Sequence, residues 1–359
     1  MRFVRVDDIK QGMEVARGIY DGSGVLMLRD GYIIDYSHIS ALKELGYPGI
    51  YIHDKISEGI EPEEIIDNVT RTTAIGTIKE MYSGIGDNKK SSIATVQAMS
   101  DEITDLVTNV AARIFESDSS VINVPLLCTY DEYTYRHSAD VGVLSIALGK
   151  ALGLTQEQMT DLGKAAFLHD IGKMFIPKTI LHKPAKLTEN EFGLMKSHSA
   201  RGYDFVESAL KQKGIICRSV LHHHERWDGA GYPFRLKGEQ IPLYSRIIAV
   251  VDVFDAISSA RPYKTAKIAT EGYEFVMANS GQHFDPKVVG AFVRSIAPFP
   301  VGLTVMLSNG LMGVVIKNHP SFMSRPVVKA YEPENPTSYE IIDLAYDMSA
   351  LNITIVETS

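Results

Sequence analysis

Seven of the eleven histidines in this chain lie between His137 and His224, in a stretch whose apolar residues repeat at helical spacing. Asp170 and Asp252 stand in the same stretch, each after a run of apolar residues. A charged group buried in such a helix costs several kcal/mol unless it is paired or binds a cation. One such group is usually a hydrogen-bonded core residue. Several His and Asp clusters along one helical stretch instead predict a buried metal site.

The ligand types narrow the choice of metal. Imidazole and carboxylate together favour Fe, Mn or Zn over Ca. His169 and Asp170 are neighbours, and neighbouring residues of a helix point about 100° apart, so they do not crowd one metal position. A carboxylate has two oxygens and can bridge two cations. The pair therefore indicates a dinuclear site.

Composition limits the partners and the compartment. Basic residues number 36 and acidic residues 44, a net charge of -8 that argues against a nucleic-acid polymer as partner. No apolar run approaches the ~18 residues of a membrane span, and the first residues, MRFVRVDDIK, lack the pattern of a signal peptide. Cys128 and Cys217 make no disulfide framework. We expect a cytoplasmic protein without membrane contact, with room for a small anionic ligand in a local basic pocket.

We expect a mainly α fold in four parts. A turn signal at Asp21-Gly22-Ser23-Gly24 and a second one at Asn309-Gly310 indicate β-hairpins near the two ends, and helical patterns fill the middle. The expected parts are a small α/β N-terminal domain (1–72) whose regulatory role is left open, a helical linker (73–120), an all-helical domain with the histidines (121–298) and a β-rich appendage (299–359).

The linker contains an amphipathic helix. Apolar residues recur at steps of three and four from Ile93 to Ile114, after a weak break at 83–86. Two interpretations stay open: the apolar face packs within its own domain, or it forms a dimer between a sensor and an output domain. For the oligomeric state we favour a homodimer through the 90–118 helix.

Two sequence strings resemble the HD-GYP family, the branch of HD-domain phosphohydrolases that hydrolyses bacterial cyclic di-GMP. They are His169-Asp170-Ile171-Gly172-Lys173 and His223-His224-Glu225-Arg226-Trp227-Asp228-Gly229-Ala230-Gly231-Tyr232-Pro233. Further family blocks in the same order are Asp131-x-Tyr133-Thr134-x-x-His137, Lys196-x-His198, Asp252-x-x-Asp255-Ala256 and Arg261-Pro262-Tyr263-Lys264. The resemblance covers residues 125–298 and implies an HD-type helical domain with phosphodiesterase activity.

The resemblance also implies two divalent metal ions, with Fe or Mn favoured and Zn or Ni left open. It assigns one ion to His137, His169, Asp170 and Asp252, and the other to Asp170, His198, His223 and His224, with Asp170 bridging. His182 and His222 are not expected to be ligands. Some family members hold a third metal with a Glu four residues before the first His, but this chain has Tyr133 there, with Glu132 beside it. We therefore predict two metals.

By the same resemblance, the expected catalytic residues are His169, Asp170 and Lys173. A hydroxide that bridges the metals would attack phosphorus in line with the 3′ leaving oxygen and give linear pGpG, with a second cleavage to GMP left open. Lys173 would lie one helical turn after His169, where it holds a phosphate oxygen or helps to protonate the leaving group. The expected substrate contacts are Lys173, Tyr232, Asp255, Arg261 and Lys264, with Asp255 accepting from the guanine N1 and N2 donors.

Two other functions stay open. An HD phosphohydrolase could act on another cyclic dinucleotide, such as a hybrid one, which a substrate panel would reveal. A sensor or adaptor would bind cyclic di-GMP without turnover, and the loss of a metal ligand would favour it, whereas every expected ligand position is occupied here. Family analogy alone suggests a diguanylate cyclase or another signalling protein as a partner.

Overall fold

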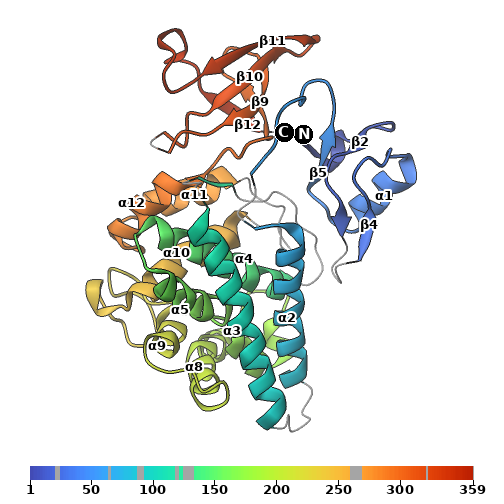
Figure 1. The fold of residues 1–359 in the computed structure, drawn as a ribbon. Coiled ribbons are helices and arrows are strands. Elements are labelled where there is room, and N and C mark those ends of the chain that lie inside the picture. Colours follow the sequence, from blue (N-terminus) through green and yellow to red (C-terminus); the bar gives the residue numbers. More distant parts are fainter. Residues whose placement is uncertain are drawn as a thin grey trace.

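The computed structural model describes residues 1–20, 25–63, 66–86, 93–117, 121–123, 133–258, 269–320 and 322–358. Helices form the body of the molecule, and two small sheets, one from each end of the chain, lie at one end of that body (Figure 1). The predicted mainly α fold is confirmed. The exact division into four ranges remains a prediction.

The N-terminal part is a three-stranded antiparallel sheet with a hairpin and one helix. Its elements are β1 (Arg2–Arg5), η1 (Val6–Asp8), β2 (Glu14–Val15), β3 (Ile19–Tyr20), β4 (Leu26–Leu28), α1 (Tyr36–Glu44) and β5 (Gly49–His53). The sheet order is β1-β5-β2, and β3 pairs with β4. Helix α1 begins after Asp35, whose side chain accepts hydrogen bonds from the backbone N–H groups of Ser37 and His38. The predicted turn at 21–24 lies outside the described residues.

The helical body contains the largest core. Its elements are α2 (Asn68–Gly86), α3 (Ile93–Glu116), α4 (Tyr133–Ala151), α5 (Gln156–Phe167), η2 (Ile171–Phe175), α6 (Lys178–Leu181), α7 (Glu189–Lys196), α8 (His198–Ser208), α9 (Ile215–His222), η3 (Gly238–Gln240), α10 (Leu243–Ser258), α11 (Ala269–Ala278) and α12 (Pro286–Ser295). Two short parallel strands, β6 (Ile122–Asn123) and β7 (Ile296–Ala297), join the segment before α4 to the segment after α12.

Helix α3 turns its apolar face into this core. Ile103, Val107, Val110 and Ile114 are buried and belong to one cluster with residues of α4 and α5. Of the two interpretations left open by the sequence, packing within the chain is the one that the structure has. A homodimer through the 90–118 helix remains a prediction, and it would have to use another face of the helix.

The C-terminal part is a five-stranded antiparallel sheet. Its elements are β8 (Thr304–Leu307), β9 (Met312–Lys317), β10 (Val327–Glu332), β11 (Asn335–Asp343), η4 (Met348–Ala350) and β12 (Ile355–Thr358), and the sheet order is β11-β10-β9-β8-β12. The predicted Asn309-Gly310 hairpin connects β8 and β9. Gly310 adopts a φ of 88°, a backbone conformation that favours glycine.

The two sheets share a hydrophobic core although they come from opposite ends of the chain. Phe3 and Tyr51 pack in one cluster with Leu303, Val328 and other residues of the C-terminal sheet. The backbone N–H of Phe3 donates to the carbonyl oxygen of Gly302 at 2.8 Å. Figure 1 shows the two chain ends side by side between the sheets. The N-terminal and C-terminal parts therefore form one composite unit.

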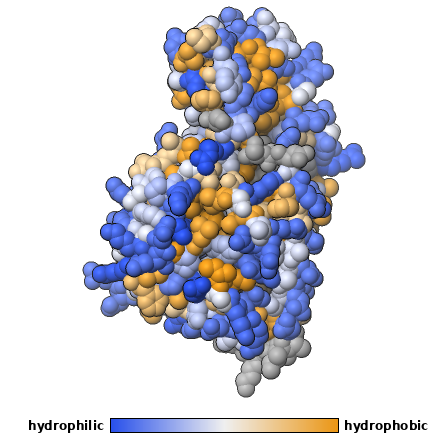
Figure 2. Space-filling view, turned by 60° about the vertical axis from the view of Figure 1, so that its left-hand side comes forward, coloured by the Kyte–Doolittle hydropathy of each residue, from blue (hydrophilic) through white to orange (hydrophobic). Residues whose placement is uncertain are grey.

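The face of the molecule seen in Figure 2 is largely hydrophilic, with apolar patches over the helical body and over the C-terminal sheet. Tyr339, Ile341 and Val356 are exposed apolar side chains of that sheet, a common feature of folded proteins. Among the described helices, none combines the length and the apolar character that a membrane span requires. The cytoplasmic location remains a prediction.

Candidate metal centre

The His-Asp pair lies in a tight turn between two helical segments. Helix α5 ends at Phe167, and the 3-10 turn η2 follows the pair, so His169 and Asp170 are held at exposed fractions of 0% and 1%. Gly172 lets this turn approach α8 closely, since a Cβ there would stand 1.8 Å from the carbonyl oxygen of His198. The glycine of the His-Asp-x-Gly string therefore brings Asp170 next to His198.

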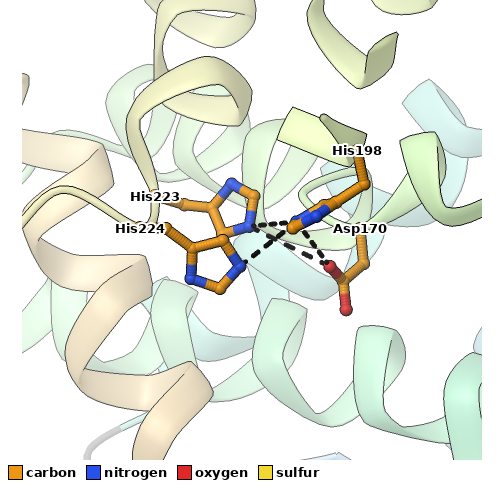
Figure 3. A group of neighbouring side chains, drawn as sticks. All are labelled: Asp170, His198, His223 and His224. Carbon is orange, nitrogen blue, oxygen red and sulfur yellow. Dashed lines mark hydrogen bonds and ion pairs between the residues drawn. The ribbon is translucent and has the colours of Figure 1, made fainter. Parts of the chain in front are cut away.

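Seven side chains gather in two adjoining groups. Within each group the ligand atoms all lie within 4.8 Å of one another. The first group is Asp170, His198, His223 and His224, and the second is His137, His169 and Asp252. Figure 3 shows the first group, whose side chains converge on one point. The structure thus places all seven predicted ligands together.

Asp170 stands between the two groups. Its Oδ1 atom lies 3.4 Å from Nε2 of His198 and 3.9 Å from Nε2 of His223. Its Oδ2 atom lies 3.4 Å from Nε2 of His169 and 3.8 Å from Nε2 of His137. Each carboxylate oxygen therefore faces a different group, as a carboxylate that bridges two cations must do.

Backbone carbonyl groups fix the tautomer of three histidines. Nδ1 of His169 donates to the carbonyl oxygen of Ala166 at 2.7 Å, and Nδ1 of His198 donates to that of Met195 at 2.7 Å. His223 makes the same contact with the residue three positions before it, at 2.6 Å. With the proton on Nδ1, each Nε2 presents its lone pair to the centre, the arrangement in which histidine ligates metals.

Several of the converging atoms have no hydrogen-bond donor among the described residues. Nε2 of His198 lies 3.2 Å from Nε2 of His223 and 3.1 Å from Nε2 of His224, so nitrogen lone pairs face one another. Nε2 of His169 and Oδ1 of Asp170 are buried with no hydrogen-bond partner among the described residues. Such atoms are costly without a cation. Imidazole nitrogens and a shared carboxylate are a donor set that fits two divalent ions.

Burial and local charge set the ionisation of the first group. Burial lowers the pKa of His223 well below its usual value and the pKa of His224 to about 3, so both imidazoles are neutral. Burial raises the pKa of Asp170, but attraction to Lys173 and His169 outweighs it, and this pKa lies well below its usual value. The centre therefore offers neutral nitrogen ligands around an ionised carboxylate.

His137 lies between two carboxylates. Its Nε2 is 3.1 Å from Oδ1 of Asp252, and its Nδ1 is 2.7 Å from Oδ2 of Asp255. Burial lowers the pKa of His137, but the hydrogen bonds with both carboxylates raise it to about 10. The Asp255 side chain is buried beside His137 and is not among the described residues that line the cleft, and its predicted guanine contact stays a prediction.

A cleft of about 670 Å³ opens over the two groups. His137, His224 and Asp252 reach it from the centre, and Lys173 and Tyr232 line it. Because η2 is a 3-10 turn, Lys173 does not follow His169 by one α-helical turn as expected, and its ammonium pairs with Asp170 instead. Arg261, Lys264 and Glu132 lie outside the described residues, and so does the side chain of Tyr133, so the expectations placed on them stay predictions.

The family model of the HD domain matches residues 122–288, the stretch that contains both groups. These residues form an HD domain. The resemblance to the HD-GYP family is confirmed for this stretch by relatives whose curated names describe cyclic di-GMP phosphodiesterases.

The HD domain has relatives with named substrates. A cyclic di-GMP phosphodiesterase of Pseudomonas aeruginosa is 41% identical over 244 residues, 67% of this chain and 59% of that protein. A cyclic di-GMP phosphodiesterase response regulator of Xanthomonas campestris is 45% identical over 153 residues, 42% of this chain and 40% of that protein. A 3′3′-cGAMP-specific phosphodiesterase of Vibrio cholerae is 35% identical over 188 residues, 52% of this chain and 33% of that protein. The chain thus spans between a third and three fifths of the length of these relatives.

Glu225 anchors the loop of the HD domain that follows His224. Its buried carboxylate accepts hydrogen bonds from the backbone N–H groups of Phe234 at 2.7 Å and of Leu236 at 3.0 Å. The loop folds back so that the Tyr232 ring lies against the His224 ring, with their centroids 4.8 Å apart. Glu225 therefore positions a wall of the cleft without reaching the substrate side.

Three further side chains that carry nitrogen groups line the cleft of the HD domain and were not predicted as site residues: Lys196, Arg226 and His283. Lys196 had a signal, because it stands two residues before His198 in a family block. Arg226 lies inside the second long string, but its guanidinium pairs with Asp228 at 2.7 Å. His283 lies far from every motif, so no pattern in the sequence could place it at the cleft.

Proposed function

We propose that the HD domain hydrolyses a phosphodiester bond of cyclic di-GMP with two divalent metal ions, Fe or Mn. The observation that carries the proposal is the placement of Asp170, with one oxygen toward each histidine group. Paired cations on either side of one carboxylate suit displacement at a phosphate. The names of the relatives support cyclic di-GMP as the substrate.

The ligands divide around Asp170. His137, His169 and Asp252 would hold one ion, and His198, His223 and His224 the other. When bound, the two ions would supply a water-derived nucleophile near neutral pH and neutralise charge on the non-bridging phosphate oxygens. The carbonyl groups that accept the Nδ1 hydrogen bonds of His169, His198 and His223 orient these imidazoles so that Nε2 would face a bound ion.

Other residues of the chain bind and orient the substrate. Lys173 lines the cleft beside Asp170, where it can hold a phosphate oxygen or donate a proton to the 3′ leaving oxygen. Burial raises the pKa of Tyr232 above its usual value, so its hydroxyl stays protonated and can donate a hydrogen bond. Arg261 and Lys264 remain proposed contacts from the motif. The expected product is linear pGpG, with GMP after a second cleavage.

The test combines metal analysis with turnover. Protein purified without oxygen would be assayed for Fe, Mn, Zn and Ni, and for cleavage of cyclic di-GMP, 3′3′-cGAMP and pGpG. Asp170→Ala removes the shared ligand, and Asp204→Ala on the exposed side of α8 is the matched control. We expect about two metal equivalents and cleavage of cyclic di-GMP in wild type and control, with both lost in Asp170→Ala.

The other outcomes separate the alternatives. Cleavage of 3′3′-cGAMP without cleavage of cyclic di-GMP would identify the hybrid dinucleotide as the substrate. Metal-loaded protein that binds cyclic di-GMP without cleaving it would be a sensor. Full turnover in Asp170→Ala would contradict the proposed metal chemistry.

A further inference from the structure

The cationic side chains that line the cleft differ in whether a carboxylate neutralises them. Lys173 pairs with Asp170, and Arg226 pairs with Asp228. Lys196 has no carboxylate partner among the residues that the structure describes. Among the described lysines and arginines that line this cleft, Lys196 is therefore the one whose ammonium forms no ion pair with a described carboxylate.

Aromatic rings, not acids, hold the Lys196 side chain. Its Nζ lies 4.5 Å from the ring centroid of Phe192 and 5.5 Å from that of Tyr232. Aromatic faces attract an ammonium without cancelling its charge. Glu191, the acid of α7 nearest to Lys196 in sequence, is already bound by the Lys183 ammonium at 2.7 Å. The surroundings therefore orient this ammonium and leave it available to an anion.

Lys196 lines two neighbouring clefts. It lines the cleft over the metal groups and also a second cleft of about 650 Å³ that includes Arg235, and Tyr232 lines both. The Tyr232 ring lies against the His224 ring, and the Lys196 ammonium lies 5.5 Å from the centroid of the same Tyr232 ring. An anion bound at Lys196 would therefore be a neighbour of the metal groups.

We propose that Lys196 binds the second, non-reacting phosphodiester of a cyclic dinucleotide while the first lies on the metal groups, an inference that rests on the proposed function. A cyclic dinucleotide carries two phosphodiesters, each with one negative charge. Metal ions held by the two groups would neutralise the reacting one, and the other needs a separate cation. Lys196 supplies it, and so favours cyclic dinucleotides over diesters with a single phosphate.

The test compares a substrate with two phosphodiesters to a substrate with one. Lys196→Met removes the charge but keeps an apolar stem against Phe192 and Tyr232, Lys196→Arg restores the charge, and Lys213→Met at an exposed position is the control. For cyclic di-GMP we expect Lys196→Met to raise KM about 10–100-fold, the size of one charged hydrogen bond, with little change in kcat. Hydrolysis of bis(p-nitrophenyl) phosphate and metal content should stay at the wild-type level, and Lys196→Arg should recover most of the KM.

Two results would overturn the assignment of Lys196. One is an equal loss on both substrates, which would place Lys196 at the reacting phosphate or in the fold. The other is wild-type KM for cyclic di-GMP in Lys196→Met.

The assignment can also be separated from the proposed function. If wild type does not cleave cyclic di-GMP, binding is measured as the inhibition of bis(p-nitrophenyl) phosphate hydrolysis by cyclic di-GMP. If neither substrate is cleaved, binding of cyclic di-GMP is measured by calorimetric titration. Weaker binding of cyclic di-GMP to Lys196→Met than to wild type would then support the Lys196 site, although the proposed hydrolysis would be contradicted. No binding of cyclic di-GMP to wild type would overturn both.

Discussion

Nδ1 of His137 lies 2.7 Å from Oδ2 of Asp255, and both side chains are buried. The carboxylate accepts a hydrogen bond from the Nδ1–H group and so directs Nε2 of His137 toward the other members of the second group, His169 and Asp252. Backbone carbonyl groups do this for His169, His198 and His223. His137 thus depends on a side chain for an orientation that the other three obtain from the backbone.

Replacing Asp255 by asparagine should weaken the second metal group. The amide keeps the size of the side chain but no longer holds the charge that orients His137, and losses of this kind lower metal affinity about 10–100-fold. Metal titration of the chelated protein would measure the effect, with Asp204→Asn as the exposed control. We expect excess metal to restore part of the activity. Unchanged affinity would mean that Asp255 does not orient His137.

Gly172→Ala should separate Asp170 from His198. The new Cβ would meet the His198 carbonyl oxygen at 1.8 Å and the Gly202 nitrogen at 2.6 Å, so backbone must move. We expect a stability loss of about 1–3 kcal/mol together with the loss of metal from the first group. Thermal unfolding and metal analysis check this result. Gly76→Ala, where a Cβ meets nothing within 4 Å, should keep both properties.

Glu225→Gln should loosen the loop that carries Tyr232. One carboxylate oxygen becomes an amide NH₂ that faces a backbone N–H instead of accepting from it. We expect about 1–3 kcal/mol lower stability, faster amide exchange at Phe234 and Leu236, and a higher KM. Hydrogen exchange and kinetics measure these changes against Glu157→Gln on the exposed side of α5. Wild-type exchange at both amides would show that the loop does not depend on this carboxylate.

Asp140 should make stability depend on acid. It pairs with Arg71 of α2 at 2.6 Å and with Arg136 at 3.1 Å. Burial raises the pKa of Asp140, but attraction to the two arginines outweighs it and holds this pKa below its usual value. A lowered carboxyl pKa adds stability above the unfolded-state pKa of about 3.9, and that stability is lost as the pH falls through the folded-state pKa.

We therefore expect Asp140→Asn to be less stable by about 2–4 kcal/mol at neutral pH, because it removes the buried carboxylate that pairs with Arg71 and Arg136. Its free energy of unfolding should also change less than that of wild type below about pH 4. Urea unfolding across this range would measure both effects, with Asp105→Asn on the exposed side of α3 as the control. Parallel pH profiles for Asp140→Asn and wild type would contradict the argument.

The sequence was informative where a residue type could not be buried without a partner. The histidines and aspartates of the helical stretch had to meet cations or one another, and the family blocks showed how to group them. The family blocks assigned Asp252 to the metal and Asp255 to the substrate, but the cost of burying a charge could not by itself separate these two aspartates. They are three residues apart on one face of α10, and only the position of His137 decides which one reaches the metal group.

Local geometry and distant packing were beyond the sequence patterns. The spacing of Lys173 from His169 suggested an α-helical turn. The structure instead has the 3-10 turn η2, which lies close to α8 at Gly172 and places Lys173 beside Asp170. The periodicity of α3 is the same whether its apolar face meets α4 and α5 or a second chain. No local sequence pattern connects Phe3 with the C-terminal sheet, because each part predicts its own strands and neither pattern indicates that the two sheets pack together.

The union of the two sheets has a consequence for the order of folding during synthesis. Oγ1 of Thr304 donates to the carbonyl oxygen of Phe3, which lies 301 residues earlier. At roughly 5–20 residues per second, a ribosome needs on the order of 15–60 seconds to cover that interval. Phe3 must wait that long for the residues of the C-terminal sheet that cover it. Residues near Phe3 therefore complete their packing only after the C-terminal sheet has been synthesised.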